Sequence, residues 1–191
     1  IENEEETIKL IDLAKKHDVC LIPYGGGTNV TNALRPPKEE NRMVVSVDTR
    51  RMNKIQSIDE ENLMVVVQAG ITGKVLEEEL NKIGFTVGHE PDSYEFSTVG
   101  GWVSTNAAGM KKHKYGNIED IVQNLTMVSP EGIINQKKPL TRSSFGIKTQ
   151  NMLFGSEGNL GIITSATLKI HRLPEHSAYE SIIFPDWETG V

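Results

Sequence analysis

Glycine is concentrated in three turns, and each turn lies next to an apolar run of the chain. These turns are residues 23–29 (PYGGGTN), 98–102 (TVGGW) and 155–161 (GSEGNLG). Because glycine has no Cβ atom, successive backbone N–H groups in such a turn can point together at an anion. Ordering so much glycine costs conformational entropy, which a bound ligand offsets. We therefore interpret the chain first as a protein that binds a phosphate-bearing cofactor.

Two common phosphate-binding loops do not match this spacing. A Walker A loop places Lys and then Ser or Thr after its last glycine, whereas Gly27 is followed directly by Thr28 and Asn29. A Rossmann fingerprint opens a helix, but residues 28–32 (TNVTN) have poor helix propensity. Several separated turns that each contribute a few N–H groups favour a long dinucleotide lying across them.

Several motifs follow one another in an order that is found in a known flavoprotein family. They are residues 23–29, 67–70 (VQAG), 91–101 (PDSYEFSTVGG) and 155–163 (GSEGNLGII). In this order they resemble the FAD-binding domain of the vanillyl-alcohol oxidase and p-cresol methylhydroxylase family, and the resemblance covers nearly the whole chain. It implies FAD as the cofactor and an α+β fold, namely a two-subdomain FAD-binding domain of the vanillyl-alcohol oxidase and p-cresol methylhydroxylase type.

Further segments resemble the ether-lipid branch of that family. They are residues 88–93 (GHEPDS), 101–105 (GWVST) and 110–120 (MKKHKYGNIED). Enzymes of this branch are transferases that exchange the acyl chain of acyl-dihydroxyacetone phosphate for a fatty alcohol, with no net redox change. For the intact protein the resemblance implies lipid substrates, a peroxisomal location, peripheral membrane association and a homodimer.

Two alternatives remain open. One is a 2-hydroxyacid dehydrogenase or a phenol-oxidising flavoenzyme of the same family, because the FAD-binding turns alone do not separate these reactions. The other is a non-enzymatic binding module in which the glycine turns are only scaffold.

The resemblance also implies that the chain is one cofactor domain of a larger enzyme. We expect this domain to span residues 1–191, with lobes at approximately 1–87 and 88–191. The C-terminal cap domain, which covers the flavin and carries the substrate-binding and acid/base residues in such enzymes, is absent. The isolated chain is therefore expected to bind FAD without turnover.

Four segments are implied to contact the cofactor. Their residues are Pro23, Tyr24, Gly25, Gly26, Gly27, Thr28, Asn29; Asp92, Ser93, Tyr94, Glu95, Phe96, Ser97, Thr98; Thr105, Asn106, Ala107, Ala108; and Glu157, Gly158, Asn159, Leu160, Gly161, Ile162, Ile163. The first turn carries no histidine for covalent attachment, so FAD is expected to be bound non-covalently. His89 precedes the second segment and is a candidate catalytic residue near the flavin, with a structural histidine as the alternative.

Composition and spacing exclude other classes of function. The formal net charge of −6 argues against a nucleic-acid partner, and no apolar run is long enough to cross a membrane. No set of His, Cys, Asp and Glu has metal-ligand spacing, so no metal site is predicted. The only cysteine, Cys20, lies in an apolar run and is interpreted as a small buried residue. Residues 111–114 (KKHK) are interpreted as a solvated face, with a phosphate site as the alternative.

The elements that must position these turns can be predicted from periodicity and capping residues. Asn3 and Glu6 predict a capping box at the start of a helix that reaches His17. Thr72 predicts the start of a second helix, which Gly84 ends. Thr98 predicts a third helix that runs toward residues 108–109 and aims its free N–H groups at an anion. Strands are predicted at residues 19–22, 43–47, 63–69 and 162–170, with a hairpin of 121–128 and 133–134.

Overall fold

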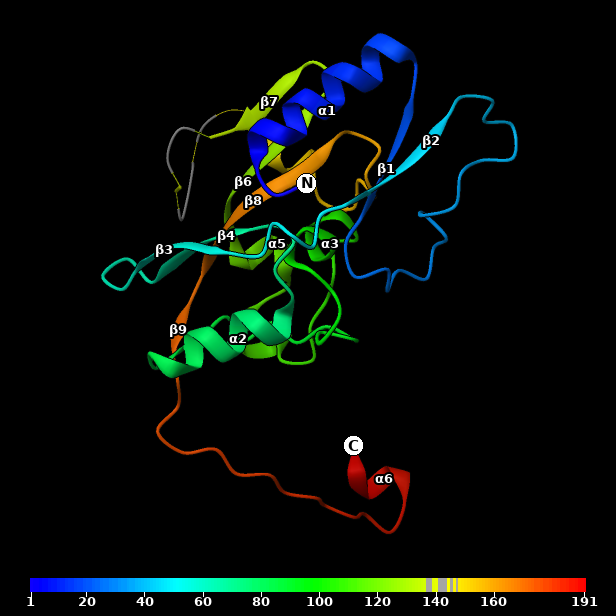
Figure 1. Ribbon diagram of the computed structural model, residues 1–191. Coiled ribbons are helices and arrows are strands. Elements are labelled where there is room, and N and C mark those ends of the chain that lie inside the picture. Colours follow the sequence, from blue (N-terminus) through cyan, green and yellow to red (C-terminus); the bar gives the residue numbers. More distant parts are fainter. Residues whose placement is uncertain (137–138, 141–143, 145, 147) are drawn as a thin grey trace.

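The computed structural model (Figure 1) describes residues 1–136, 139–140, 144, 146 and 148–191 of the chain. In chain order its elements are α1 (Glu4–His17), β1 (Cys20–Tyr24), β2 (Val44–Asp48), β3 (Ile55–Asp59), β4 (Met64–Gln68), α2 (Gly73–Lys82), β5 (Phe85–Thr86), α3 (Val99–Ser104), α4 (Lys112–Tyr115), α5 (Ile118–Ile121), β6 (Val122–Ser129), β7 (Gly132–Asn135), the 3₁₀ helix η1 (Thr149–Met152), β8 (Ile162–Lys169), β9 (His171–Arg172) and α6 (Trp187–Gly190). This mixture of helices and antiparallel strands is the predicted α+β class.

The main sheet contains five strands in the order β3-β4-β8-β6-β7, and every neighbouring pair is antiparallel. β1 and β2 form a separate parallel pair, in which Tyr24 lies opposite Asp48. β5 pairs with β9. Strands from both sides of residue 87 share the main sheet. The division into lobes at approximately 1–87 and 88–191 stays a prediction.

The main sheet is covered by helices on both faces (Figure 1). Successive residues of a strand point to opposite faces, and Met127 and Val128 of β6 accordingly belong to different apolar clusters. Met127 packs in the larger cluster, with Leu76 and Leu80 of α2 and with residues of α3 and α5. Val128 packs in the smaller cluster with Ile11 of α1. α1 thereby joins the main sheet to the β1-β2 pair, whose ends carry the first glycine turn.

The first two helices begin where their capping residues predict. The Asn3 side chain accepts a hydrogen bond from the Glu6 N–H at 2.9 Å, and the Thr72 side chain accepts one from the Val75 N–H at 3.4 Å. The return bond of the capping box differs, because the Glu6 carboxylate accepts from the Glu2 N–H and not from that of Asn3. α2 ends at Lys82, and Gly84 follows in the left-handed conformation with φ of 82°.

The third helix is shorter than predicted. Thr98 caps its start as expected, but α3 ends at Ser104 and does not reach residues 108–109. Asn106 takes the left-handed conformation with φ of 49°, and the Ala107 N–H turns back to the Trp102 carbonyl. This reversal places residues 107–108 beside the helix instead of at its end.

Other differences concern short or exposed segments. No strands were predicted at the positions of β3, β5 and β9. β3 is a mostly exposed edge strand, and the other two have only two residues each. The predicted strand at residues 121–128 begins one residue later, because Ile121 completes α5. Cys20 is only partly buried, since its strand lies in the small two-stranded sheet near the surface. After β9 the chain runs away from the body to α6 (Figure 1).

Candidate functional site

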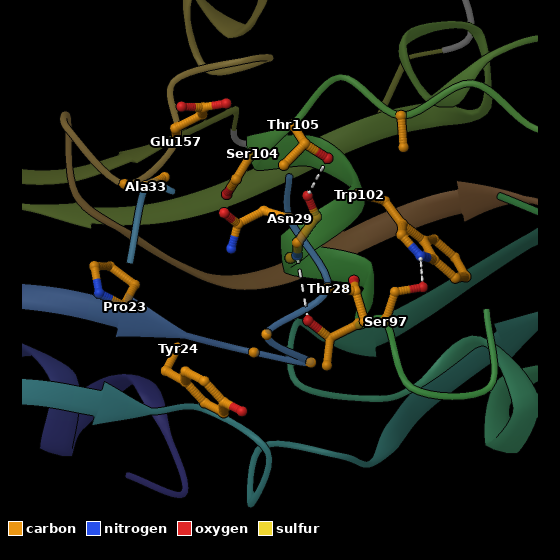
Figure 2. A pocket seen from close by; sticks show the side chains of 18 of the residues that line it. Pro23, Tyr24, Thr28, Asn29, Ala33, Ser97, Trp102, Ser104, Thr105 and Glu157 are labelled. Carbon is orange, nitrogen blue, oxygen red and sulfur yellow. Dashed lines mark hydrogen bonds between the residues drawn. The ribbon is translucent and has the colours of Figure 1, made fainter. Parts of the chain in front are cut away.

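A cleft of about 400 Å³ lies where the glycine turns meet (Figure 2). Its wall takes in residues 23–31 at the end of β1 and after it, residues 97–108 around α3, and residues 157–163 before and within β8. These segments are far apart in the sequence, and the two sheets with α3 bring them to one place. The three turns singled out from their glycine content therefore share one cleft.

The first turn packs directly against the segment before α3. A Cβ atom built on Gly25 would collide with the Thr98 side chain, and one on Gly26 would collide with the Phe96 carbonyl oxygen. At Gly27 the backbone is left-handed, with φ of 68°, and the position of a Cβ atom lies 2.6 Å from the Tyr24 hydroxyl. These glycines are therefore required for close packing of the turn on its neighbours, beyond any approach to a ligand.

The same turn offers unused backbone donors to the cleft. Within the part of the chain that the structure describes, the N–H groups of residues 26–29 donate no hydrogen bond to another residue. Backbone N–H groups are strong donors that need a partner, and several in succession form a concave site for an anion. Such a set of donors suits an anionic group.

The second turn does not supply helix N–H groups to an anion, contrary to the prediction. The Val99 N–H donates to the Ile71 carbonyl at 3.0 Å and the Gly100 N–H to the Ala69 carbonyl at 2.7 Å. The Gly101 N–H is capped by Thr98 at 3.3 Å. The start of α3 is thus tied to the chain that follows β4, and it contributes packing surface instead of free donors.

The third turn is fixed to the end of α3 and to the first turn. The Gly155 N–H donates to the Val103 carbonyl at 3.0 Å, and the Glu157 N–H donates to the Ser104 carbonyl at 2.9 Å. Gly158 is left-handed, with φ of 83°, and the position of its Cβ atom lies 3.1 Å from the Pro23 ring. The turns therefore form one connected wall.

Trp102 forms the buried end of this wall. Its indole N–H donates to the Ser97 hydroxyl at 2.8 Å, as Figure 2 shows. His89 packs edge-on against the same indole with 5.0 Å between ring centroids, and only 1% of His89 is exposed. Burial lowers the pKa of His89 to about 4, so its ring is neutral near pH 7. His89 lies behind Trp102 and outside the cleft lining, a position that favours the structural alternative.

The charged side chains of the lining are carboxylates. Asp92 and Glu157 line the cleft, and no lysine, arginine, histidine or cysteine is among the described lining residues. A bound diphosphate would therefore be stabilised mainly by N–H dipoles, because the lining supplies no cation. The same lining offers neither a histidine nor a cysteine for covalent attachment of a flavin.

Most of the predicted contact residues meet at the cleft, and some do not. Those in the lining are Pro23, Tyr24, Gly25, Gly26, Gly27, Thr28, Asn29, Asp92, Ser97, Thr98, Thr105, Ala107, Ala108, Glu157, Gly158, Gly161, Ile162 and Ile163. Those outside it are Ser93, Tyr94, Glu95, Phe96, Asn106, Asn159 and Leu160. Ser93 is left-handed, with φ of 57°, and Phe96 is 67% exposed, although its backbone packs against Gly26.

Other lining residues were absent from the predicted contacts. They are Val30, Thr31, Ala33, Leu34, Thr49, Pro91, Gly100, Gly101, Trp102 and Ser104. Gly100, Gly101 and Trp102 belong to the second glycine turn, so their spacing carried a usable signal. Residues 30–34 have no hydrophobic period and no cap, and only the folded turn shows that they border the cleft. Among the described residues, no cluster of His, Cys, Asp and Glu could hold a metal ion, and none of the described helices could span a membrane.

Comparison with protein families decides the class of this site. The model of the family described as "FAD binding domain" matches residues 1–136. The chain belongs to the FAD-binding domain family. FAD is the cofactor of this domain, in agreement with the free N–H groups of the first turn. Family membership speaks against the alternative in which the glycine turns are only scaffold.

Curated relatives and solved structures show which members of the family this chain is similar to. The chain is 52% identical over 189 residues to the alkyldihydroxyacetonephosphate synthase of Caenorhabditis elegans, an alignment covering 99% of this chain and 32% of that protein. A solved structure of an alkyldihydroxyacetonephosphate synthase superposes with a TM-score of 0.86 at 41% identity, covering 92% of this chain and 31% of the other. A mitochondrial D-lactate dehydrogenase of Kluyveromyces lactis is 31% identical over 184 residues, which are 96% of this chain and 31% of that protein. The chain thus spans about a third of the length of these relatives.

Proposed function

We propose that this FAD-binding domain is the cofactor part of an enzyme that exchanges the acyl chain of acyl-dihydroxyacetone phosphate for a fatty alcohol, forming an ether lipid. The observation that carries the proposal is the margin in identity. Nearly the same span is 52% identical to an alkyldihydroxyacetonephosphate synthase and 31% identical to a D-lactate dehydrogenase. The structural match to a synthase at a TM-score of 0.86 supports the same assignment.

The residues of this chain bind and orient the cofactor. The N–H groups of residues 26–29 hold the diphosphate, and the turn around Gly158 closes the wall against Pro23. Buried Trp102, fixed by Ser97, gives the cleft a rigid apolar end. When bound, FAD supplies an electron-accepting isoalloxazine ring, and the protein supplies position and electrostatics.

We further propose that FAD is bound non-covalently. The support is the cleft lining, whose described residues include no histidine or cysteine. Acid precipitation of the FAD-loaded chain should release all of the flavin into the supernatant. Flavin that stays with the precipitated polypeptide would contradict this part of the proposal.

For the whole protein the proposal includes lipid substrates, a peroxisomal location, peripheral contact with a membrane and a homodimer. It also includes the absence of turnover by the isolated chain of 191 residues, because the acid/base groups are assigned to a separate cap domain. Ether-lipid product formed by this chain alone would overturn that point.

A second candidate is a 2-hydroxyacid dehydrogenase, which the 31% identity to a D-lactate dehydrogenase supports. The two reactions are separated by one pair of assays on the longer protein that contains this domain. With acyl-dihydroxyacetone phosphate and radiolabelled hexadecanol, we expect the label to appear in an ether lipid and D-lactate to leave the flavin oxidised. Bleaching of the flavin by D-lactate, without incorporation of alcohol, would establish the dehydrogenase instead.

A further inference from the structure

The first glycine turn has no hydrogen bonds of its own to hold its shape. Among the described residues, no backbone hydrogen bond begins or ends within residues 25–31. Its conformation must therefore come from the residues against which it packs. On the inner side these are the Phe96 backbone and the Thr98 side chain. On the other side the nearest side chain is that of Tyr24.

Tyr24 lies on the side of β1 opposite to Pro23, as expected from the alternation of a strand (Figure 2). Its hydroxyl reaches the underside of Gly27, and the residue is part of the cleft lining. Within the described part of the chain, the hydroxyl has no hydrogen-bond partner. A free O–H donor thus lies next to Gly27, one of the four residues whose N–H groups are free.

The position of Tyr24 is fixed from the segment that follows β2. The Thr49 N–H and hydroxyl both donate to the Tyr24 carbonyl, at 2.9 and 3.1 Å. The Arg50 guanidinium carbon lies 5.3 Å from the centre of the Tyr24 ring. Arg50 is held in turn by Asp48, which accepts from its Nε at 3.0 Å and from its Nη2 at 2.6 Å. Stacking of a cation on the ring restricts where the hydroxyl can point.

We propose that the Tyr24 hydroxyl is a side-chain donor to the phosphate groups of the bound dinucleotide, and that Arg50 is a positioning residue that acts through the Tyr24 ring. A hydrogen bond to a charged acceptor is stronger than one between neutral groups, and its loss leaves that acceptor under-satisfied. It rests on the proposed placement of the diphosphate at the first turn, and it does not depend on which reaction the larger enzyme catalyses.

Dissociation constants for FAD test the proposal, measured on the chain by quenching of flavin fluorescence. Tyr24→Phe removes only the hydroxyl, and we expect FAD to bind about 10- to 100-fold more weakly. Arg50→Gln removes the stacked cation and should weaken binding by about threefold to fivefold. Arg51→Gln is the matched control, because it removes the same charge from the next residue, which pairs with Glu2 and not with Tyr24. It should leave the constant within about twofold of the parent.

A double variant and a spectroscopic signal separate this role from general destabilisation. If Arg50 acts through the Tyr24 hydroxyl, Arg50→Gln should have little further effect in a Tyr24→Phe background. The ³¹P resonances of bound FAD should also shift in Tyr24→Phe. Single-variant losses that simply add in the double variant would overturn the role of Arg50. An unchanged affinity or unchanged ³¹P resonances in Tyr24→Phe would overturn the role of the hydroxyl.

Discussion

Adding one methyl group at Gly26 tests how the first turn presents its N–H groups. A Cβ atom there would collide with the Phe96 carbonyl oxygen and lie 2.8 Å from the Ser97 Cα atom. Both atoms belong to the backbone, so neither can swing aside. The segment that carries them is held by hydrogen bonds from the Phe96 and Ser97 N–H groups to the Ser93 carbonyl, at 2.9 and 2.8 Å. The turn itself has no such bonds, so the turn is the part that moves.

The expected loss of FAD affinity in Gly26→Ala follows from the free-energy cost of this collision. An extra methyl group in a tightly packed region costs about 1–3 kcal/mol. If the turn recovers its binding shape only at this cost, Gly26→Ala should weaken FAD binding by about 5- to 150-fold. The dissociation constant is measured by titrating the purified chain with FAD and following the quenching of flavin fluorescence.

A second glycine serves as the control for lost stability. Gly84 is left-handed, with φ of 82°, and has open space around the position of a Cβ atom, so alanine there strains the backbone without a collision. Gly84 also lies outside the cleft lining. We expect Gly84→Ala to lower the melting temperature and to keep the affinity for FAD. The reasoning is refuted if Gly26→Ala binds FAD as the parent does, or if Gly84→Ala loses as much affinity.

Three further predictions follow from buried or charged groups of the site. Because burial lowers the pKa of His89 from 6.5 to about 4, the unfolded chain binds a proton there that the folded chain does not. The free energy of unfolding should therefore fall as the pH is lowered from 6.5 to about 4, by up to about 1.4 kcal/mol per pH unit. His89→Leu should flatten this part of the pH profile of unfolding, and identical slopes would contradict the assignment. Ser97→Ala leaves the buried Trp102 N–H without its partner and should cost about 1–3 kcal/mol in urea unfolding; a change below about 0.5 kcal/mol would show that the hydrogen bond is dispensable. The cleft lining supplies no cation, so the dissociation constant for FAD should change less than about threefold between 50 and 500 mM salt, and a steep dependence would point to a cation that acts on the diphosphate.

The sequence was most informative where a local rule decides the structure. Asn3 and Thr72 cap helices because a side-chain oxygen replaces a missing backbone partner, and that requirement is local. The shared cleft could also be predicted, because glycine lets the backbone N–H groups of several turns point at one anionic ligand. The order of these turns along the chain carried the resemblance to a flavoprotein family, and that resemblance identified the ligand as FAD.

The sequence was least informative where distant segments meet. The first N–H groups of α3 are satisfied by carbonyls of Ala69 and Ile71, which only the fold brings to that place. The reversal of the chain at Asn106 depends on a left-handed backbone conformation. Asparagine adopts this conformation only occasionally, and no sequence pattern predicts it here. Similarly, the collision that makes Gly26 necessary is with Phe96, and the sequence gives no distance between these residues. Contacts of this kind are set by tertiary packing and cannot be obtained from periodicity.

Hydrogen exchange of the backbone amides, measured by mass spectrometry with and without FAD, tests the central claim most directly. In the free chain the N–H groups of residues 26–29 have no partner among the described residues, so they should exchange rapidly. Saturating FAD should slow their exchange strongly, while the amides at the start of α3, already bonded to carbonyls, change little. If FAD binds and residues 26–29 exchange as fast as before, the first turn does not hold the diphosphate.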